Sequence, residues 1–221
     1  MLHFYLAGIN NQNFLMRDKE TGTWWQQITG KAIYGPLQGA ALSLVFSDEL
    51  TFGEWKTEYP AGQVLAPVAK YAKEYDSNWE PDVAKLPVVI SFPGTQLKSR
   101  DVVIGLTANG AARAYPWETF AKQSPVVDRV NGTPLLLVLG PDGKSFRVFL
   151  SRINGRDAEF FLQADSKDWM LVDSTTASQW NFQGCAISGP AQGKCLDQIP
   201  ALKDYWFDWR NYHPDTSIYK H

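Results

Sequence analysis

The sequence of 221 residues predicts a mainly β fold with short helices, built from an internally duplicated module. Short runs of branched and aromatic residues are separated by turn dipeptides such as Asn109-Gly110 and Asp142-Gly143. These runs do not alternate with long helical segments, so a parallel α/β sheet is not expected. A stretch near residue 30 also returns near residue 184, which indicates two related units.

The repeated stretch covers residues 30–42 and occurs again at 184–196, 154 residues later. At that spacing, ten of the 31 positions from 30 to 60 are identical in both copies. Average residue usage predicts about two identities by chance. The identical positions are Gly30, Ala32, Ile33, Gly35, Pro36, Gln38, Gly39, Leu42, Trp55 and Pro60.

This repeat divides the chain into three parts. Residues 1–62 have partners in the later copy, whereas 100–156 have none, so the first part is interpreted as the back half of a first module. Residues 63–99 are rich in proline and polar residues and are interpreted as a linker. Residues 100–221 are expected to form a complete second module. A half-module exposes unpaired strand edges, so we expect a second copy or a partner chain to complete it.

In the first part, alternating apolar residues predict a strand at 2–7, and a second apolar run follows at 14–16. Strands are expected at 31–34 and 41–46, on either side of a glycine-rich turn. Aromatic residues spaced by three and four predict a short helix at 52–59, which ends before Pro60.

In the second module, the clearest signal is a β-hairpin over 102–115, because an Asn-Gly dipeptide separates two strand-like runs. A short helix is expected at 116–120, since proline is favoured in the first turn of a helix. Further strands are predicted at 135–139, 146–150 and 158–162.

The two cysteines, Cys185 and Cys195, lie within the second repeated stretch. A hairpin that turns near Pro190 places them opposite each other, which favours a cross-strand disulfide and an oxidising compartment. The alternative is a pair of reduced, buried thiols. The first copy has Lys31 and Ala41 at these positions, so the fold does not require the bridge.

Several motifs together resemble the bacterial family known as domain of unknown function 3179. They are NGAARAYP at 109–116, VVDRVNGTP at 126–134, WFDWRNYHPDT at 206–216 and the long first-half run at 11–39. The resemblance implies two tandem units in an exported protein, and so an extracytoplasmic (periplasmic or secreted) location with the signal outside this chain. It also implies a CPLCG-type cysteine pair at the front of the first unit, whereas the second unit has VLGPDGKSF at 138–146.

Composition and motifs argue against several classes of function. A net charge of −2 without a basic stretch makes a nucleic-acid partner unexpected. No apolar run reaches the ~18 residues of a membrane span. The three histidines, His3, His213 and His221, have no zinc-binding spacing and make a Ser-His-Asp triad improbable. We therefore assign no catalytic residue, metal ligand or cofactor.

One polar cluster stands out because the first copy is richer in amides than the second. The predicted ligand-binding residues are Asn11, Asn13, Asp18, Trp25 and Gln26. The alternative is surface drift between the copies, and Asp18 recurs as Asp173 ahead of Trp180, which fits an Asp that caps a turn.

Taken together, the sequence predicts a non-catalytic, extracytoplasmic, β-rich binding or interaction module of unknown ligand. This interpretation depends on the duplication, the high aromatic content of 14% and the lack of nucleophile or metal motifs. The alternative is one part of a redox or metal-dependent enzyme whose cysteine-bearing front half is missing from this chain.

Overall fold

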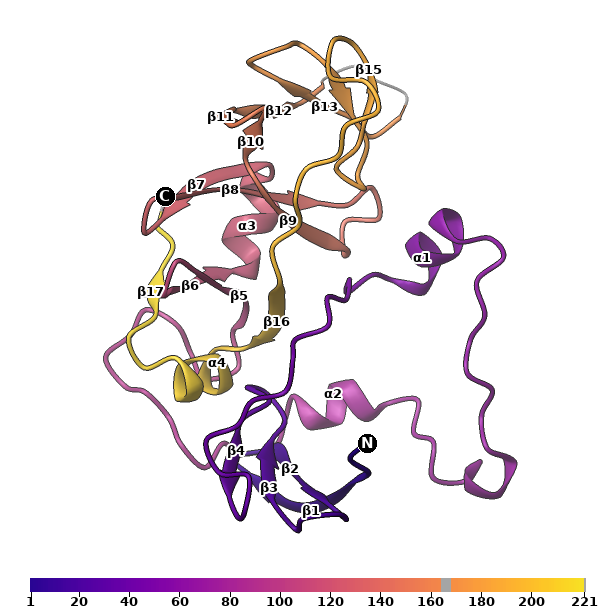
Figure 1. The fold of residues 1–221 in the computed structure, drawn as a ribbon, viewed down its shortest axis with the longest axis vertical. Coiled ribbons are helices and arrows are strands. Elements are labelled where there is room, and N and C mark those ends of the chain that lie inside the picture. The colour runs from indigo at the N-terminus through magenta and orange to yellow at the C-terminus, as the bar shows by residue number, and fades with distance from the viewer. Residues whose placement is uncertain (164–167, 221) are drawn as a thin grey trace.

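The computed structural model describes residues 1–163 and 168–220 and confirms a mainly β fold with short helices (Figure 1). The first part contains one antiparallel sheet, in which four strands follow each other in chain order. These strands are β1 (Phe4–Asn10), β2 (Asn13–Asp18), β3 (Trp24–Gln26) and β4 (Ala32–Tyr34). Helix α1 (Phe52–Glu58) comes next, after a segment without regular structure.

The expected linker is largely irregular and exposed, with two short helical turns, η1 (Ala69–Tyr71) and α2 (Trp79–Val83). Its many prolines and polar residues bury little apolar surface. Within the part of the chain that the structure describes, no helix is long and apolar enough to cross a membrane.

The second part begins with the predicted hairpin, which is the centre of a four-stranded sheet in the order β16-β5-β6-β17. Its strands are β5 (Val102–Ala108), β6 (Ala111–Pro116), β16 (Ala201–Tyr205) and β17 (Ser217–Ile218). Helix α3 (Trp117–Gln123) follows β6, and helix α4 (Trp206–Tyr212) follows β16. Because β16 runs directly into α4, the helix folds back onto the hairpin and buries two tryptophans there.

The remaining strands form three further sheets. One contains β7 (Val126–Val130), β8 (Thr133–Leu139) and β9 (Phe146–Leu150), and a two-stranded ribbon contains β10 (Arg152–Ile153) and β11 (Arg156–Asp157). The last contains β12 (Phe160–Leu162), β13 (Leu171–Asp173), β14 (Gln179–Trp180) and β15 (Ala186–Ser188). This sheet has the same chain-order meander as β1 to β4.

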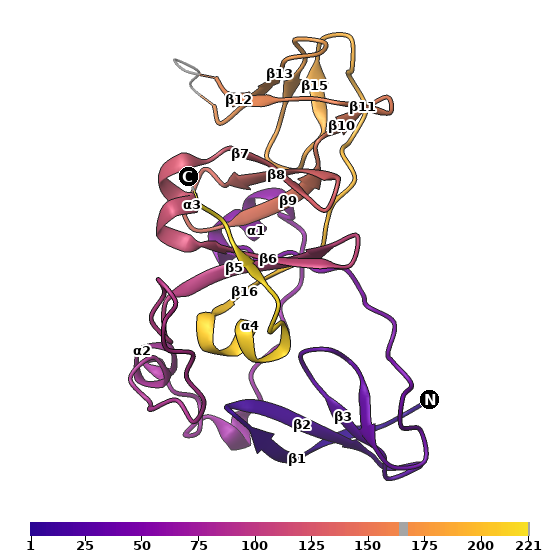
Figure 2. The same ribbon diagram turned by 90° about the vertical axis from the view of Figure 1, so that its left-hand side faces the viewer.

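The sheets are stacked along the long axis of the molecule (Figure 2). Helix α4 lies between the sheet of β5 and β6 and the first sheet, and α1 lies beside β9. The two main hydrophobic clusters lie in the second part, where Leu135 and Leu136 of β8 point to opposite sides and are both fully buried. The second part therefore carries most of the core, and the first part is attached to it.

Two sequence predictions have clear outcomes. The structure contains the disulfide between Cys185 and Cys195, which are directly opposite each other, and Lys31 faces Ala41 in the same way. The prediction of a strand at 41–46 was wrong, because only Ala41 pairs with another residue and the rest of the run is exposed. Strand propensity needs a neighbouring strand to bond with, and this segment has none within the described residues.

Candidate functional site

Among the predicted ligand-binding residues, Asp18 and Trp25 form a buried pair inside the first sheet. The indole Nε1 of Trp25 donates to Asp18 Oδ2 at 2.8 Å, and the backbone and hydroxyl of Thr21 donate to the same carboxylate. Burial alone would raise the pKa of Asp18, but these hydrogen bonds lower it to about 2. The same bond joins Trp180 to Asp173 at 2.9 Å, so both carboxylates close a turn within their own sheet.

Asn11 and Asn13 attach the first sheet to its neighbours. The side-chain oxygen of Asn11 accepts a hydrogen bond from the backbone of Ile90 at 3.2 Å. The side-chain amide of Asn13 donates to the carboxylate of Asp208 on α4. The β1–β2 turn is thus held between the linker and the second part, whereas the buried side-chain nitrogen of Asn11 has no hydrogen-bond partner within the described residues.

Gln26 belongs to a separate turn, where its side-chain oxygen accepts a hydrogen bond from the hydroxyl of Thr29 at 2.6 Å. The five predicted residues therefore fall into three hydrogen-bonded groups: the Asp18–Trp25 pair, the β1–β2 turn and the turn after β3. They share one sheet but do not all point into one cavity among those that the described residues line.

The contact made by Asn13 leads to a pair of acidic residues that the sequence did not single out. Burial raises the pKa of Asp204 on β16 to about 8, and the negative charge of Asp208 adds to this rise. Burial also raises the pKa of Asp208. One oxygen of Asp204 is buried and accepts no hydrogen bond within the described residues. A proton on Asp204 therefore relieves the repulsion between two close carboxyl groups.

This acidic pair predicts a stability that falls as the pH rises. The folded-state pKa of Asp204 lies above its ordinary value of 3.8, so the folded protein binds more protons than the unfolded chain between about pH 4 and 8. The free energy of unfolding should decline over this window by on the order of a few kcal/mol. Urea unfolding at pH 5 and at pH 8 measures this decline in the free energy of unfolding.

The control is Asp204→Asn, which keeps the shape of the side chain but cannot ionise. Its free energy of unfolding should change less between the two pH values than that of the wild type. An equal decline in both proteins would assign the pH dependence to other groups.

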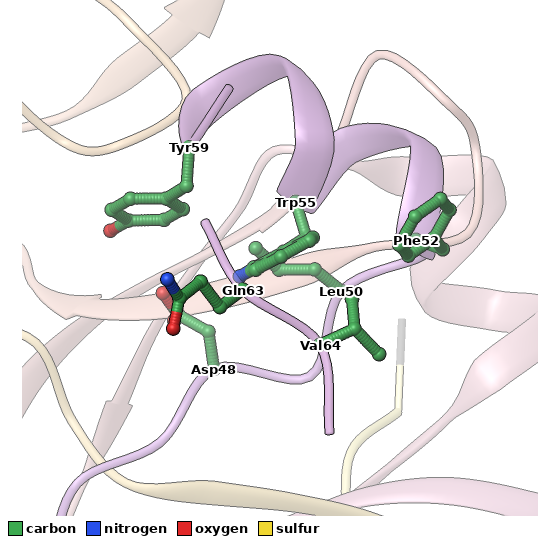
Figure 3. Close-up of a pocket in the computed structure, with 7 residues that line it drawn as sticks. All are labelled: Asp48, Leu50, Phe52, Trp55, Tyr59, Gln63 and Val64. Carbon is green, nitrogen blue, oxygen red and sulfur yellow. The ribbon is translucent and has the colours of Figure 1, made fainter. Parts of the chain in front are cut away.

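A second candidate site is an open cavity of about 630 Å³ beside α1. It is lined by Asp48, Leu50, Phe52, Trp55, Tyr59, Gln63 and Val64 (Figure 3). The indole of Trp55 points from the helix toward Leu50 and Gln63, and Phe52 and Tyr59 lie at either end of the helix. Most of these side chains are apolar, which suits an apolar or extended ligand.

The helix beside this cavity is held to the second part by ionic and polar contacts. Arg147 on β9 has 2% of its side chain exposed and contacts Glu58 at 2.6 Å and Asp48 at 2.7 Å. At the start of the helix, Thr51 accepts from the backbone of Glu54 and donates to Asp142 at 2.6 Å. These contacts fix the orientation of α1, so its aromatic residues face the cavity.

The exposure of α1 contrasts with that of α4, which begins 154 residues later in the chain. Phe52 is 65% exposed, whereas Trp206, 154 positions later, is 1% exposed; Trp55 is half-buried, whereas Trp209 is 4% exposed. The sequence pointed to these two helices through aromatic residues at the same spacing, Phe52 and Trp55 in α1 and Trp206 and Trp209 in α4. Which of the two helices is covered depends on its packing partners and could not be predicted from the pattern.

Fold and site together define a β-rich protein with two similar meander sheets and one aromatic helix left open to a cavity. A family model described as a protein of unknown function (DUF3179) matches residues 5–216, and the chain belongs to this family. The comparisons found no matching curated protein and no matching solved structure.

Proposed function

We propose that this chain is a non-catalytic, extracytoplasmic binding module that uses the cavity beside α1 to hold a partner. The observation that carries the proposal is the exposed aromatic face of a helix whose orientation is fixed by buried ion pairs. Large exposed apolar patches on soluble proteins usually mark interaction surfaces. Aromatic residues are also enriched where binding energy is concentrated.

Comparative capture tests this function. Immobilised wild-type chain and the Trp55→Ala variant are exposed to the extracytoplasmic fraction of the source cells, and bound proteins are compared by mass spectrometry. The proposal expects a partner that is enriched on the wild type, reduced at least about tenfold on Trp55→Ala and unchanged on Tyr34→Ala, an exposed residue of the first sheet. Equal capture by all three baits, or turnover of a substrate by the isolated chain, contradicts it.

The location in this proposal predicts an oxidised protein in the cell. The Cys185–Cys195 bond is compatible with an oxidising compartment, since such bonds are rare in the cytosol. Rapid alkylation of the natural protein in acid-quenched cells should leave both cysteines unmodified, whereas prior reduction should expose two alkylation sites. Two alkylated cysteines without reduction would contradict an extracytoplasmic location.

A further inference from the structure

The β5–β6 hairpin covers the aromatic residues of α4, and this arrangement can be compared with the uncovered helix α1. β5 pairs with β16 in the antiparallel direction, and β6 pairs with β17 in the parallel direction. Helix α4 lies on the hairpin, and Val103 and Ala114 bury Trp206 and Trp209 in one cluster. The hairpin therefore fills the space between β16, β17 and α4.

The residues that line the cavity beside α1 correspond to the residues that surround this hairpin. Each lining residue has a counterpart 154 positions later. The counterparts are Leu202 and Asp204 of β16, Trp206 and Trp209 of α4, His213 after it, and Ser217 and Ile218 of β17. The cavity thus lies where a two-stranded hairpin lies in the second part, and its borders, 47–51 and 63–64, have no strand partner among the described residues.

The chemistry of the hairpin follows from the contacts at α4. A Cβ atom added at Gly105 would come within 2.3 Å of the ring of Trp209, so only glycine fits there. Gly105 pairs with Leu202, whose counterpart in the first part is Asp48. The helix-facing neighbours of this glycine, Val103 and Ala114, are small or branched. A hairpin that covers Trp55 therefore needs a glycine opposite Asp48 and compact apolar residues around it.

We infer that the cavity beside α1 is the docking site of a β-hairpin from outside these 221 residues. The inference rests on the proposed binding function and names its partner. One strand of the hairpin pairs antiparallel with residues 47–51 and carries glycine opposite Asp48, and the other pairs parallel with residues 63–64. Binding by strand addition gives main-chain hydrogen bonds, and the aromatic face of α1 gives the apolar contacts.

A second copy of this chain is a poor occupant, because its own hairpin is already in use. Both outer edges of β5 and β6 are paired with β16 and β17, and one face of the hairpin is covered by α4. The docking of a copy would require its second part to open. Charge does not oppose an external hairpin, since the lining includes a single carboxylate, Asp48, whose partner is Arg147.

The test uses the full chain and a cyclic peptide with the sequence of residues 101–116. In the peptide, Ile104, Leu106 and Tyr115, which face the other core cluster, are replaced by threonine to prevent aggregation. Cyclisation is needed because an isolated two-stranded hairpin is marginally stable, and circular dichroism checks that the peptide is folded. Hydrogen exchange with mass spectrometry then reports the backbone protection of the chain.

The inference expects slower exchange at 47–51, at 63–64 and at the adjoining Leu65 when the peptide is added. The G105V peptide should bind at least about tenfold more weakly, because valine collides with the indole ring. Trp55→Ala should also weaken binding about tenfold. Leu65→Pro is a second variant that should weaken binding, because proline removes a backbone N–H. The counterpart of Leu65, Tyr219, donates its backbone N–H to Ala114 of β6, and Leu65 itself is 94% exposed. Tyr34→Ala should bind like the wild type.

The inference is overturned by no protection at about 1 mM folded peptide, by protection of one border without the other, or by equal binding of the glycine and valine peptides. Concentration-dependent dimerisation of the chain that protects the same two borders would assign the site to a second copy instead. Trp55-dependent capture of a partner in the absence of peptide binding would leave the binding function in place and reject the hairpin. Failure of both experiments would reject both proposals.

Discussion

Replacing Arg147 by methionine is expected to lower the free energy of unfolding by about 3–5 kcal/mol and to release α1 from β9. The guanidinium contacts both oxygens of Glu58 and one oxygen of Asp48, and Glu58 is 7% exposed. Removal of the cation leaves a carboxylate in a place where little water can solvate it. Chemical denaturation measures the loss, and hydrogen exchange over residues 48–58 locates it.

Two comparisons separate this charge effect from a loss of packing. Arg129→Met removes an exposed ion pair with Asp157 and should cost at most about 1 kcal/mol. Combining Arg147→Met with Asp48→Asn and Glu58→Gln removes all three charges and should recover much of the lost stability. If the triple variant is no more stable than Arg147→Met alone, the arginine acts through its packing against Phe182 and not through its charge.

The pattern of the sequence was sufficient to predict the elements whose stability is local. Asn109 and Gly110 both have positive φ values in the turn between β5 and β6, as an Asn-Gly hairpin requires. The aromatic spacing at 52–59 gave helix α1, and Thr51 supplies its N-terminal cap. The pairing of Cys185 with Cys195 followed from a turn placed near Pro190, between the two cysteines. In each case the residues that decide the structure lie within a few positions of each other.

The candidate site was harder to predict because its residues come together only through long-range packing. Asn13 was singled out for its amide, but its partner Asp208 lies 195 residues later. Arg147 and Glu58 are 89 residues apart, and neither belongs to a recognisable motif. The pKa shift of Asp204 depends on burial, which a residue pattern does not supply. Sequence analysis identified polar groups but could not identify their partners.

Replacing Trp209 by alanine is expected to lower the free energy of unfolding by about 3–5 kcal/mol. Its ring is 4% exposed, packs directly on the backbone of Gly105 and donates a hydrogen bond to Thr216 at 2.9 Å. The cavity left by the indole cannot close easily, because the sheet beneath it is fixed by strand pairs on both sides. Denaturant unfolding, followed by the near-ultraviolet signal of the remaining aromatic residues, measures the loss.

The matched variant Trp55→Ala removes a tryptophan of α1 that lies 154 residues earlier in the chain, and it should cost less than about 2 kcal/mol, because this ring faces an open cavity. The difference between the two variants measures how much of the stability of such a helix comes from the hairpin that covers it. If an external hairpin docks on α1, adding it should bring the cost of Trp55→Ala closer to that of Trp209→Ala. Equal costs in the free chain would mean that Trp55 is already covered, and the cavity would then offer no docking surface.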